Sequence, residues 1–464
     1  MSRKVSVLWA AVLVITTFGG GLLGAASKSA KDITAFAVGG VSGSIDGTAI
    51  TVDLPALFTR VDGLVATFTT TGKSVKVGAR VQVSGKTAND FTKPVAYTVL
   101  AADGSSASYT VRVNLPRPAA IAAYDDTLVV GSDGSLWATG RNGDGELGLG
   151  NTSSVTRPKQ VLPSGVAAVA AGYYHTLILK SDGSLWATGY AKLGQLGNGG
   201  GASVSAPVQV IDGGVASVAA GVNFSLVVKT DGSLWATGYN SSGQLGNGTT
   251  NNLLAFTKVI DSGVASVSGG VDHALIVKTD GSLWAVGSNS HGQLGTGGTA
   301  DSKVPVKVLD SGVASASAGN SHSVFVKTDG SLWAMGYNKY GQVGNGTRDN
   351  ALAPVQVIPG GVASAVAGGD HTLVVKTDGS LWVFGYNKNG QLGNGGKDDL
   401  PVPTQLLASG VAAAAGGLVH TVVLKTDHSL WTVGYNANGE LGNGGADVAK
   451  LVQIRGPAMA RDDQ

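Results

Sequence analysis

The chain has 464 residues, of which 13% are charged, and its formal net charge is +2. This weak charge balance gives no electrostatic argument for a nucleic acid or an anionic membrane as a partner. The absence of cysteine excludes disulfides, thiolate metal sites and cysteine nucleophiles.

The N-terminus has the order of a secretory signal peptide. Arg3 and Lys4 precede an apolar run over residues 5–24, and small residues follow up to Ala26. We therefore predict that residues 1–26 are a signal peptide cleaved after Ala26. An uncleaved N-terminal anchor is the alternative, because the apolar run approaches the length that spans a bilayer. In both cases we expect the rest of the chain to be extracytoplasmic, that is secreted, periplasmic or at the cell surface.

Segment 32–115 alternates apolar and polar residues over six short stretches that turn residues separate. This period of two, repeated at short spacing, predicts a small β-sandwich. The expected strands are Ile33–Val38, Ala49–Val52, Leu64–Phe68, Val75–Val77, Val95–Val99 and Tyr109–Val113. On the residues Asn89–Val99, Ala102–Gly104 and Tyr109–Val111, the segment resembles an immunoglobulin-like accessory domain of bacterial surface and secreted proteins. The resemblance implies a spacer or an adhesive module.

Seven versions of the stretch Asp-Gly-Ser-Leu-Trp-Ala-Thr-Gly, which first occupies Asp133–Gly140, organise the remaining chain. Its tryptophan recurs every 49 residues, as Trp137, Trp186, Trp235, Trp284, Trp333, Trp382 and Trp431. A fixed period without insertions indicates a repeat architecture.

The residue pattern within each repeat predicts four short strands. In the second repeat these are Val166–Gly172, His175–Lys180, Ser184–Gly189 and Pro207–Val210. Asp182-Gly183 joins the second strand to the third and is a strong hairpin signal, because glycine tolerates the positive φ of a tight turn. Proline at the start of the fourth strand fits an outer edge. The predicted fold is therefore all-β, with a seven-bladed β-propeller over 119–456 and a disordered tail over 457–464.

Both ends of the repeat region carry strands that complete the ring. Ala119–Ala123 supplies a first strand before the first tryptophan, and Leu451–Ile454 a fourth strand after the last one. We expect the two ends to meet, while the pattern leaves open which blade boundary closes the ring. Each tryptophan is expected to be a packing wedge between neighbouring blades, whose loss to alanine would cost about 3–5 kcal/mol.

In fixed order, the motifs His-Thr-Leu, Asp-Gly-Ser-Leu, Gly-Tyr-Asn and Gly-Gln-Leu-Gly-Asn-Gly resemble the regulator of chromosome condensation repeat family, from about Ala119 to Gly456. The resemblance implies the propeller fold. Many family members carry tryptophan before the glycine that closes the third strand, whereas this chain has Thr139, Thr188, Thr237, Val286, Met335, Phe384 and Val433.

Histidine occupies one equivalent position in five repeats, at His175, His273, His322, His371 and His420. Asp126 and Phe224 replace it in the other two, which favours a structural role over a metal or anion site. We expect each histidine to fix the turn between the first and second strands by hydrogen bonding to backbone. The repeated aspartates stand in hairpin turns, where Asp is a structural choice. We therefore predict no catalytic residues, no metal and no cofactor.

Tyrosines and other departures from the repeat consensus are the candidate ligand contacts, because tyrosine offers apolar area and a polar tip. The candidates are Arg141, Tyr173, Tyr174, Tyr190, Phe224, Tyr239, Tyr337, Tyr386 and Tyr435. The alternative is that each tyrosine packs over the rim of its own blade. Departures at Arg141–Leu149, Tyr173–Tyr174, Phe224 and Asn251–Phe256 predict a binding patch on the first three blades.

These features predict an exported, monomeric and non-enzymatic scaffold that presents a propeller loop face to a protein or glycan ligand. No nucleic acid is expected as a partner, and no membrane beyond the possible anchor. The hypothesis depends on fold and location, because no chemical motif stands out. The alternative is a proteinaceous inhibitor of a secreted or periplasmic enzyme, since the bacterial propeller-type β-lactamase inhibitor has this fold and location.

Two further functions are less favoured. Guanine nucleotide exchange on a small GTPase, the nuclear activity of the family, relies on loop insertions and a nuclear setting, and these uniform repeats show neither. A propeller enzyme would need non-repeated polar residues at one pole, and the near-identical repeats leave few.

Overall fold

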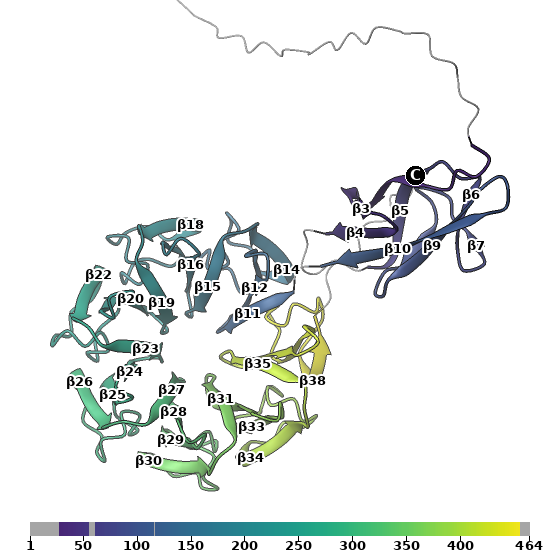
Figure 1. Cartoon of the computed structure of the whole chain (residues 1–464). Coiled ribbons are helices and arrows are strands. Elements are labelled where there is room, and N and C mark those ends of the chain that lie inside the picture. Colours follow the sequence, from purple (N-terminus) through teal and green to yellow (C-terminus); the bar gives the residue numbers. More distant parts are fainter. Residues whose placement is uncertain (1–26, 55–60, 116, 455–464) are drawn as a thin grey trace, which may run out of the picture. The chain divides into compact units, whose positions relative to one another are not determined.

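The computed structural model describes residues 27–54, 61–115 and 117–454, in which every regular element is a β-strand (Figure 1). Two compact units are formed, one that ends at Asn114 and one that comprises Leu54 and the residues from Leu115 onward. The signal peptide or anchor predicted for 1–26 and the tail predicted for 457–464 lie outside the described residues. Within the described residues, no helix has the length and hydropathy to cross a membrane.

The first unit consists of two sheets, with the strand orders β2-β1-β5-β8 and β3-β4-β10-β9-β6-β7. The bounds are β1 Ile33–Val38, β2 Val41–Ser42, β3 Ser44–Asp46, β4 Ala49–Asp53, β5 Asp62–Thr70, β6 Ser74–Val77, β7 Arg80–Val81, β8 Ala88–Asp90, β9 Val95–Leu100 and β10 Ser106–Asn114. The β4–β10 pair is parallel. All six predicted strands are confirmed, and four shorter strands join them.

Tyr97 lies at the centre of the first unit and packs the two sheets together. Its ring centroid is 5.1 Å from that of Phe36 and 6.0 Å from that of Phe68, both on the facing sheet. The hydroxyl accepts a 2.8 Å hydrogen bond from Asn89 Nδ2, and burial raises the pKa of Tyr97 to about 12. Aromatic rings that meet across two sheets are the expected core of a β-sandwich.

Seven four-stranded sheets form the second unit, and each sheet takes its strands in sequence order (Figure 1). Blades 1 to 3 are β11 Pro118–Ala123, β12 Asp126–Gly131, β13 Leu136–Gly140, β14 Val155–Leu162; β15 Val166–Ala171, β16 His175–Lys180, β17 Leu185–Gly189, β18 Val204–Ile211; and β19 Val215–Ala220, β20 Phe224–Lys229, β21 Leu234–Gly238, β22 Leu253–Ile260. Blades 4 and 5 are β23 Val264–Gly269, β24 His273–Lys278, β25 Leu283–Gly287, β26 Ser302–Leu309; and β27 Val313–Ala318, β28 His322–Lys327, β29 Leu332–Gly336, β30 Ala351–Ile358. Blades 6 and 7 are β31 Val362–Ala367, β32 His371–Lys376, β33 Leu381–Gly385, β34 Leu400–Leu407; and β35 Val411–Gly416, β36 His420–Lys425, β37 Leu430–Gly434, β38 Val448–Gln453.

The predicted seven-bladed propeller is therefore confirmed, with one correction to the fourth strand. In blade 2 this strand begins at Val204, three residues before the proline that was expected to start it. Pro207 can lie inside β18 because the strand forms the outer edge, where one side needs no N–H donor.

Blades 1 and 7 meet directly and close the ring. Each is complete in itself, so no strand crosses from one end of the chain into the other end's sheet. The backbone N–H of Leu418 in blade 7 donates to the carbonyl of Tyr124 in blade 1 at 2.6 Å. A side-chain bond, between His420 Nε2 and Thr127 Oγ1 at 3.0 Å, joins the same two blades. Closure thus uses the ordinary boundary between two whole blades.

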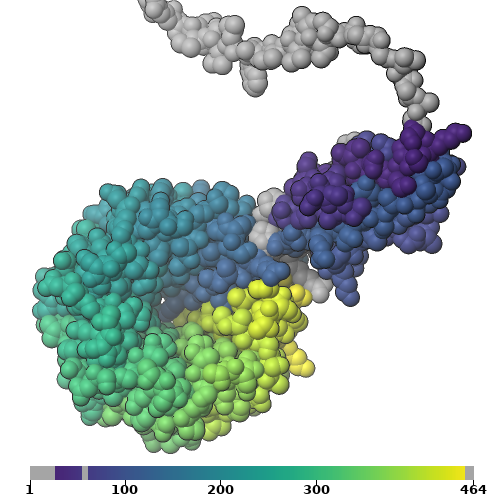
Figure 2. Space-filling view, in the orientation of Figure 1, coloured from purple at the N-terminus to yellow at the C-terminus, as the bar shows by residue number. Residues whose placement is uncertain are grey.

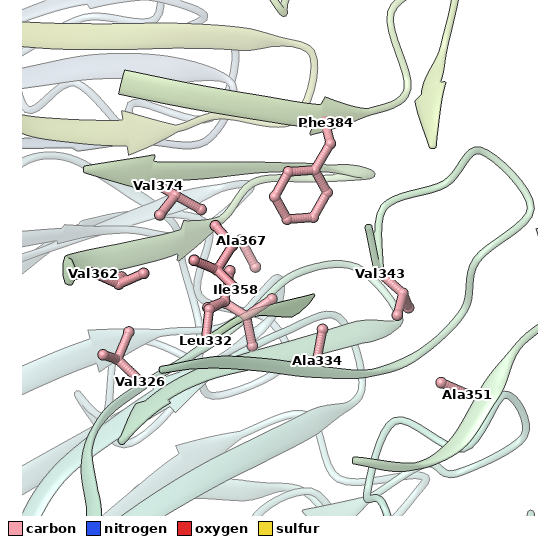
Figure 3. Packing of buried hydrophobic residues seen from close by; sticks show 11 residues of the cluster. Val326, Leu332, Ala334, Val343, Ala351, Ile358, Val362, Ala367, Val374 and Phe384 are labelled. Carbon is pink, nitrogen blue, oxygen red and sulfur yellow. The ribbon is translucent and has the colours of Figure 1, made fainter. Parts of the chain in front are cut away.

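Apolar side chains fill the space between blades (Figure 3). Phe384 of blade 6 belongs to one such core together with Val326, Leu332 and Ala334 of blade 5. The repeated tryptophans lie at the margins of these cores, each against the core of the preceding blade, as Trp382 does against blade 5 and Trp137 against blade 7. Their predicted role as wedges between blades is confirmed.

The innermost strands carry mainly alanine, glycine, serine and valine, and they line an axial cavity of about 260 Å³. Small side chains suit this position because the blades converge on the axis. Side chains fill most of the centre of the ring in the space-filling view (Figure 2). Tyr124 is the one aromatic residue among the described residues that line the cavity.

Candidate functional site

One end of every blade carries two loops, and we call this end of the propeller the loop face. Because the strands are antiparallel, the loop after the first strand and the loop after the third strand leave the blade at the same end. The opposite end carries the tight hairpins, which are Asp-Gly in six blades and Asp427-His428 in blade 7, and we call it the hairpin face. The loop face therefore has the longer connections, which is where a rigid scaffold commonly places binding residues.

A buried asparagine shapes each long loop after the third strand, except in blade 2, where Ala191 replaces it. In blade 5, Asn338 Oδ1 accepts a 3.0 Å bond from the N–H of Val343. Its Nδ2 donates to Asn345 Oδ1 and to the carbonyls of Thr347 and Asp349, at 3.0–3.1 Å. The loop is thus fixed from inside, and its exposed side chains are held in place.

The tyrosine that precedes this asparagine is anchored by its own backbone. The N–H of Tyr337 donates to the carbonyl of Ser321 at 2.8 Å, and that of Tyr190 to Tyr174 at the same distance. All five tyrosines at this position are partly exposed, namely Tyr190, Tyr239, Tyr337, Tyr386 and Tyr435. The tyrosine candidates therefore lie on one face.

Four tyrosines and one arginine form a contiguous cluster on blades 1 and 2, which we call the first aromatic cluster. Ring centroids lie 5.7 Å apart for Tyr124 and Tyr173, 4.2 Å for Tyr173 and Tyr174, and 5.9 Å for Tyr174 and Tyr190. The Arg141 guanidinium lies 4.8 Å from the ring centroid of Tyr174 and 5.6 Å from that of Tyr173. Four candidates from the sequence, Arg141, Tyr173, Tyr174 and Tyr190, thus come together.

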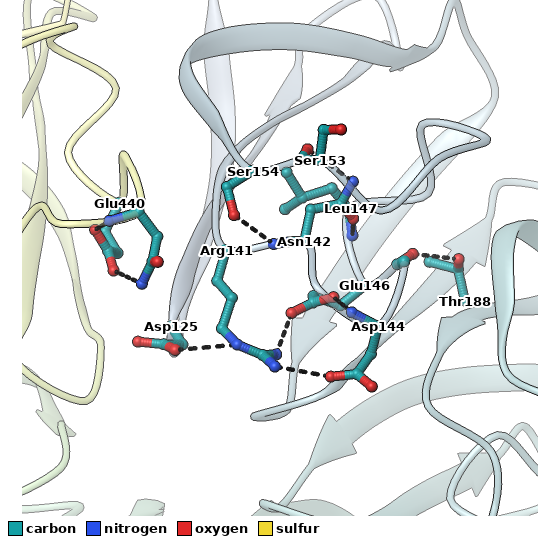
Figure 4. A network of polar contacts seen from close by, with 12 residues as sticks. Asp125, Arg141, Asn142, Asp144, Glu146, Leu147, Ser153, Ser154, Thr188 and Glu440 are labelled. Atoms are coloured by element: carbon teal, nitrogen blue, oxygen red, sulfur yellow. Dashed lines mark hydrogen bonds and ion pairs between the residues drawn. The ribbon is translucent and has the colours of Figure 1, made fainter.

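Carboxylates hold Arg141 in place (Figure 4). Its Nη2 donates to Asp144 Oδ2 at 2.8 Å, its Nη1 pairs with Glu146 Oε1, and its Nε lies 3.9 Å from Asp125 Oδ2. A guanidinium with its donors already engaged keeps its flat face for the tyrosines. The arginine therefore stiffens the cluster and is not a free anion-binding group.

A second aromatic cluster lies on blades 4 to 6 of the same face. Ring centroids are 4.7 Å apart for His291 and Tyr337, 6.0 Å for Tyr337 and Tyr340, and 4.8 Å for Tyr340 and Tyr386. All four side chains are partly exposed. His291 and Tyr340 stand at equivalent positions of adjacent repeats, and His291 was not among the candidates from the sequence.

Polar side chains lie between the two clusters, near the axis. Tyr124 Oη donates to Asn320 Oδ1 at 3.0 Å, and Asn320 Nδ2 donates to Asp370 Oδ2 at 3.4 Å. Asp370 also accepts a 3.1 Å bond from Gln342 Nε2. Burial is the main cause that raises the pKa of Asp370.

The boundary between blades 7 and 1 lacks the glutamine-to-aspartate hydrogen bond that Gln342 and Asp370 form between blades 5 and 6. Where Gln244 donates to Asp272 of the next blade at 3.0 Å, the equivalent positions at the closure hold Glu440 and Asp125 (Figure 4). Glu440 and Glu146 are the only two glutamates in the whole sequence, and both replace this glutamine. Burial, and after it the charge of Glu440, raises the pKa of Asp125 to about 6.

The five repeated histidines have a structural role, but the predicted partner was wrong. Instead of backbone at its own turn, His175 Nε2 bonds to Ser225 Oγ of the next blade at 2.8 Å. That hydroxyl donates its hydrogen to the Gln195 carbonyl, so the histidine is the donor and its Nδ1 is unprotonated. Burial lowers the pKa of His175 to about 3, which keeps it neutral.

Phe224 is buried in blade 3 with no exposed surface, so it contributes no ligand contact. It fills the place of the histidine, and the next blade has Ala274 where other blades have a hydroxyl.

Outside the first aromatic cluster, the other residues that led to the predicted patch on blades 1 to 3 do not gather in one place. Phe256 of blade 3 packs at the edge of the blade 2 core. Tyr239 and Tyr435 have no aromatic neighbour among the described residues. The predicted patch on blades 1 to 3 thus narrows to the first aromatic cluster.

Asp126 fills the histidine position in blade 1 without replacing its hydrogen bond. Both carboxylate oxygens are buried and unpartnered, and so is the Thr176 hydroxyl of the next blade. Burial raises the pKa of Asp126 well above its usual range. Within the described residues, no group of three or more histidine, aspartate or glutamate side chains could hold a metal ion.

Family comparisons match both units. The RCC1-like domain matches residues 106–359, and the regulator of chromosome condensation (RCC1) repeat matches residues 362–391 and 378–424. The N-terminal domain of SGBP, the surface glycan-binding protein, matches residues 33–113. A comparison with curated proteins found no match.

Solved propellers share the fold. Human WBSCR16 is 24% identical with a TM-score of 0.61, covering 70% of this chain and 94% of its own. Prp20p from Saccharomyces cerevisiae is 21% identical with a TM-score of 0.62, covering 73% of this chain and 87% of its own. At these identities the likeness concerns the fold alone.

Proposed function

The chain belongs to the RCC1-like domain family, and from this premise we propose that it is a non-enzymatic scaffold at the cell surface whose loop face binds a glycan. The observation that carries the proposal is the gathering of tyrosines into two clusters on one face. Had each tyrosine packed over the rim of its own blade, the rings would be evenly separated by whole blades. Instead, Tyr173 and Tyr174 in blade 2 and Tyr340 in blade 5 bridge between neighbours.

The chemistry of the face supports a glycan as the ligand. A pyranose ring offers C–H groups to a tyrosine ring and hydroxyls to amides and carboxylates. Both kinds of partner are present, as aromatic rings in the clusters and as Asn320 and Asp370 near the axis. The match of residues 33–113 to the N-terminal domain of a surface glycan-binding protein supports the same ligand class and a location outside the cytoplasm.

A protein ligand is the second candidate for the same face. Tyrosine and arginine are common in the energetic centres of protein interfaces, and Arg141 lies against Tyr173 and Tyr174. Prp20p, which has the same fold, is described by its binding to Gsp1p and histones. Inhibition of an exported enzyme would be one form of this second function.

The test uses the purified chain on an array of β-1,4-glucan, β-1,3-glucan, xylan and α-1,4-glucan oligosaccharides. The variant Tyr173→Val/Tyr174→Asn removes two rings and uses the residues that blade 3 has at these positions, Val222 and Asn223. The matched control is Tyr239→Ser, which removes an isolated tyrosine and uses the residue of blade 4, Ser288. We expect retention of at least one glycan, a loss of about tenfold or more in the double variant, and no loss in the control.

Absence of retention of every glycan would reject the proposal. Retention that the double variant leaves unchanged would move the site away from the loop face. Release of reducing sugar from a retained glycan would contradict the non-enzymatic role.

A further inference from the structure

The two aromatic clusters are parts of one continuous track of residues. Tyr124 belongs to the first cluster through its contact with Tyr173, and its hydroxyl reaches Asn320 in blade 5. It therefore connects the two sides of the axis. Rings that merely decorated separate blades would have no such connection.

The track continues from Asn320 into the second cluster. Asn320 Nδ2 donates to Asp370, and the carbonyl of Asp370 accepts a 2.8 Å bond from the N–H of Tyr386. The ring of Tyr386 contacts Tyr340, which contacts Tyr337. Along the track the order is thus aromatic rings, then polar groups at the axis, then aromatic rings again.

Side chains along the track are partly exposed and held in place from below. The backbone N–H groups of Tyr190, Tyr337 and Tyr386 are bonded to carbonyls within their own blades. Gln342 orders the loop of Tyr340 by accepting the Tyr340 N–H at 3.0 Å and by donating to Asp370. A surface that is ordered before binding loses little conformational entropy when a ligand arrives.

We propose that the loop face binds one linear polysaccharide chain along this track, with the two aromatic clusters as stacking subsites at its ends. Tyr124, Asn320 and Asp370 form the polar subsite between them and bond to the sugar hydroxyls. The inference rests on the proposed function, and it adds that the ligand is a chain that spans the axis. A single short sugar fills one cluster only.

A chain that occupies both clusters gains affinity because its second contact is intramolecular. Linked sites of this kind exceed a single site by a factor of about 100 to 10,000 when the linker matches the span. A dimer of the same sugar reaches one cluster and lacks this gain. Affinity therefore depends on chain length and not only on sugar identity.

The experiment is isothermal titration of the purified chain with a dimer, a tetramer and an octamer of β-1,4-glucan, β-1,3-glucan, xylan and α-1,4-glucan. One variant is Tyr173→Val/Tyr174→Asn. The other is Tyr337→Ser/Tyr340→Asn, which introduces the residue types found at the equivalent positions Ser288 and Asn389. These replacements occur at the same positions of other blades, so the fold accepts them. Tyr239→Ser is again the matched control.

We expect the octamer to bind about 100-fold more tightly than the dimer, and each cluster variant alone to remove this difference. Equal affinity for octamer and dimer, or a loss from only one of the two variants, would overturn the track while leaving glycan binding intact. Absence of heat with every sugar would instead reject the proposed function itself.

Discussion

The hydroxyl of Tyr124 in blade 1 donates a 3.0 Å hydrogen bond to Asn320 Oδ1 in blade 5, on the other side of the propeller axis. Around the axis the blades otherwise present small side chains to a cavity of about 260 Å³. This single side chain therefore couples two blades that share no interface.

Removal of that hydroxyl tests the coupling. Tyr124→Phe keeps the ring and its contact with Tyr173, but leaves Asn320 Oδ1 without its donor. We expect the free energy of unfolding to fall by about 1 kcal/mol, the usual contribution of one hydrogen bond. Urea denaturation followed by tryptophan fluorescence measures it, and an unchanged midpoint would show that the bond does not stabilise the ring.

The histidine-to-hydroxyl bridge between blades gives a second prediction. Blade 3 replaces histidine by Phe224, and blade 4 then has Ala274 in place of the hydroxyl. We therefore expect His322→Phe to cost about 1–3 kcal/mol, because it leaves the Thr372 hydroxyl without its histidine partner. Addition of Thr372→Ala should recover part of this loss, and a double-mutant cycle by urea denaturation measures the recovery. Strict additivity of the two changes would contradict the pairing.

Blade 1 lacks the histidine-to-hydroxyl bond, and restoring it should stabilise the protein. A glycine three residues before each ring makes room for it, since a methyl group on Gly172 would overlap the His175 ring. Blade 1 has Ala123 at this position, which is compatible with the shorter Asp126. Asp126→His alone should therefore fail to stabilise, whereas Ala123→Gly/Asp126→His should add about 1–2 kcal/mol by bonding Thr176 and removing an unpaired carboxylate. Thermal unfolding compares them, and an equal gain from the single variant would refute the steric argument.

The carboxyl group of Asp125, at the boundary between blades 7 and 1, makes the free energy of unfolding depend on pH. Because the folded pKa of Asp125 is about 6, above its ordinary 3.8, the group favours folding below pH 4, and this contribution is lost as pH rises through 6. Asp125→Asn, which borrows the residue of Asn223, removes the effect. We expect the variant to gain up to about 3 kcal/mol over the parent chain between pH 4 and 7.

The buried histidines act in the opposite direction. Burial lowers the pKa of His175 to about 3 and that of His371 to about 4, so their contribution is present above pH 6.5 and lost as pH falls. The two effects overlap in the parent chain, which is why the comparison of Asp125→Asn with the parent chain at each pH is needed. A constant difference across this range would show that Asp125 titrates normally.

The sequence was enough to predict the blades, because the strand alternation and the Asp-Gly hairpins are short-range signals and the tryptophan period shows that they recur every 49 residues. The placement of tyrosines on loops followed from the same register. What the chain order could not reveal is which loops meet in space. Tyr124 and Asn320 are separated by three whole blades along the chain, and their contact exists only because the ring closes.

Phe224 shows a different limit of prediction from the sequence. Considered alone, it is a departure from a repeated histidine, and departures suggested function. Considered with Ala274 in the next repeat, it is an apolar replacement of a buried polar pair. Comparison of the repeats at paired positions, and not one position at a time, would have placed it in the core. Glu440, which replaces the glutamine of other repeats, is the signal in the sequence for the unusual boundary between blades 7 and 1.

The loop face, and not the hairpin face, is the surface that we propose to bind the ligand. Hydroxyl-radical footprinting of the purified chain, with and without the octamer that the titration selects, tests it most directly. We expect protection of Tyr173, Tyr174, Tyr337 and Tyr340 together. The repeated tryptophans, which come directly after the hairpins at the hairpin face, should be unchanged. Protection of those tryptophans, or of residues before Leu115 alone, would contradict it.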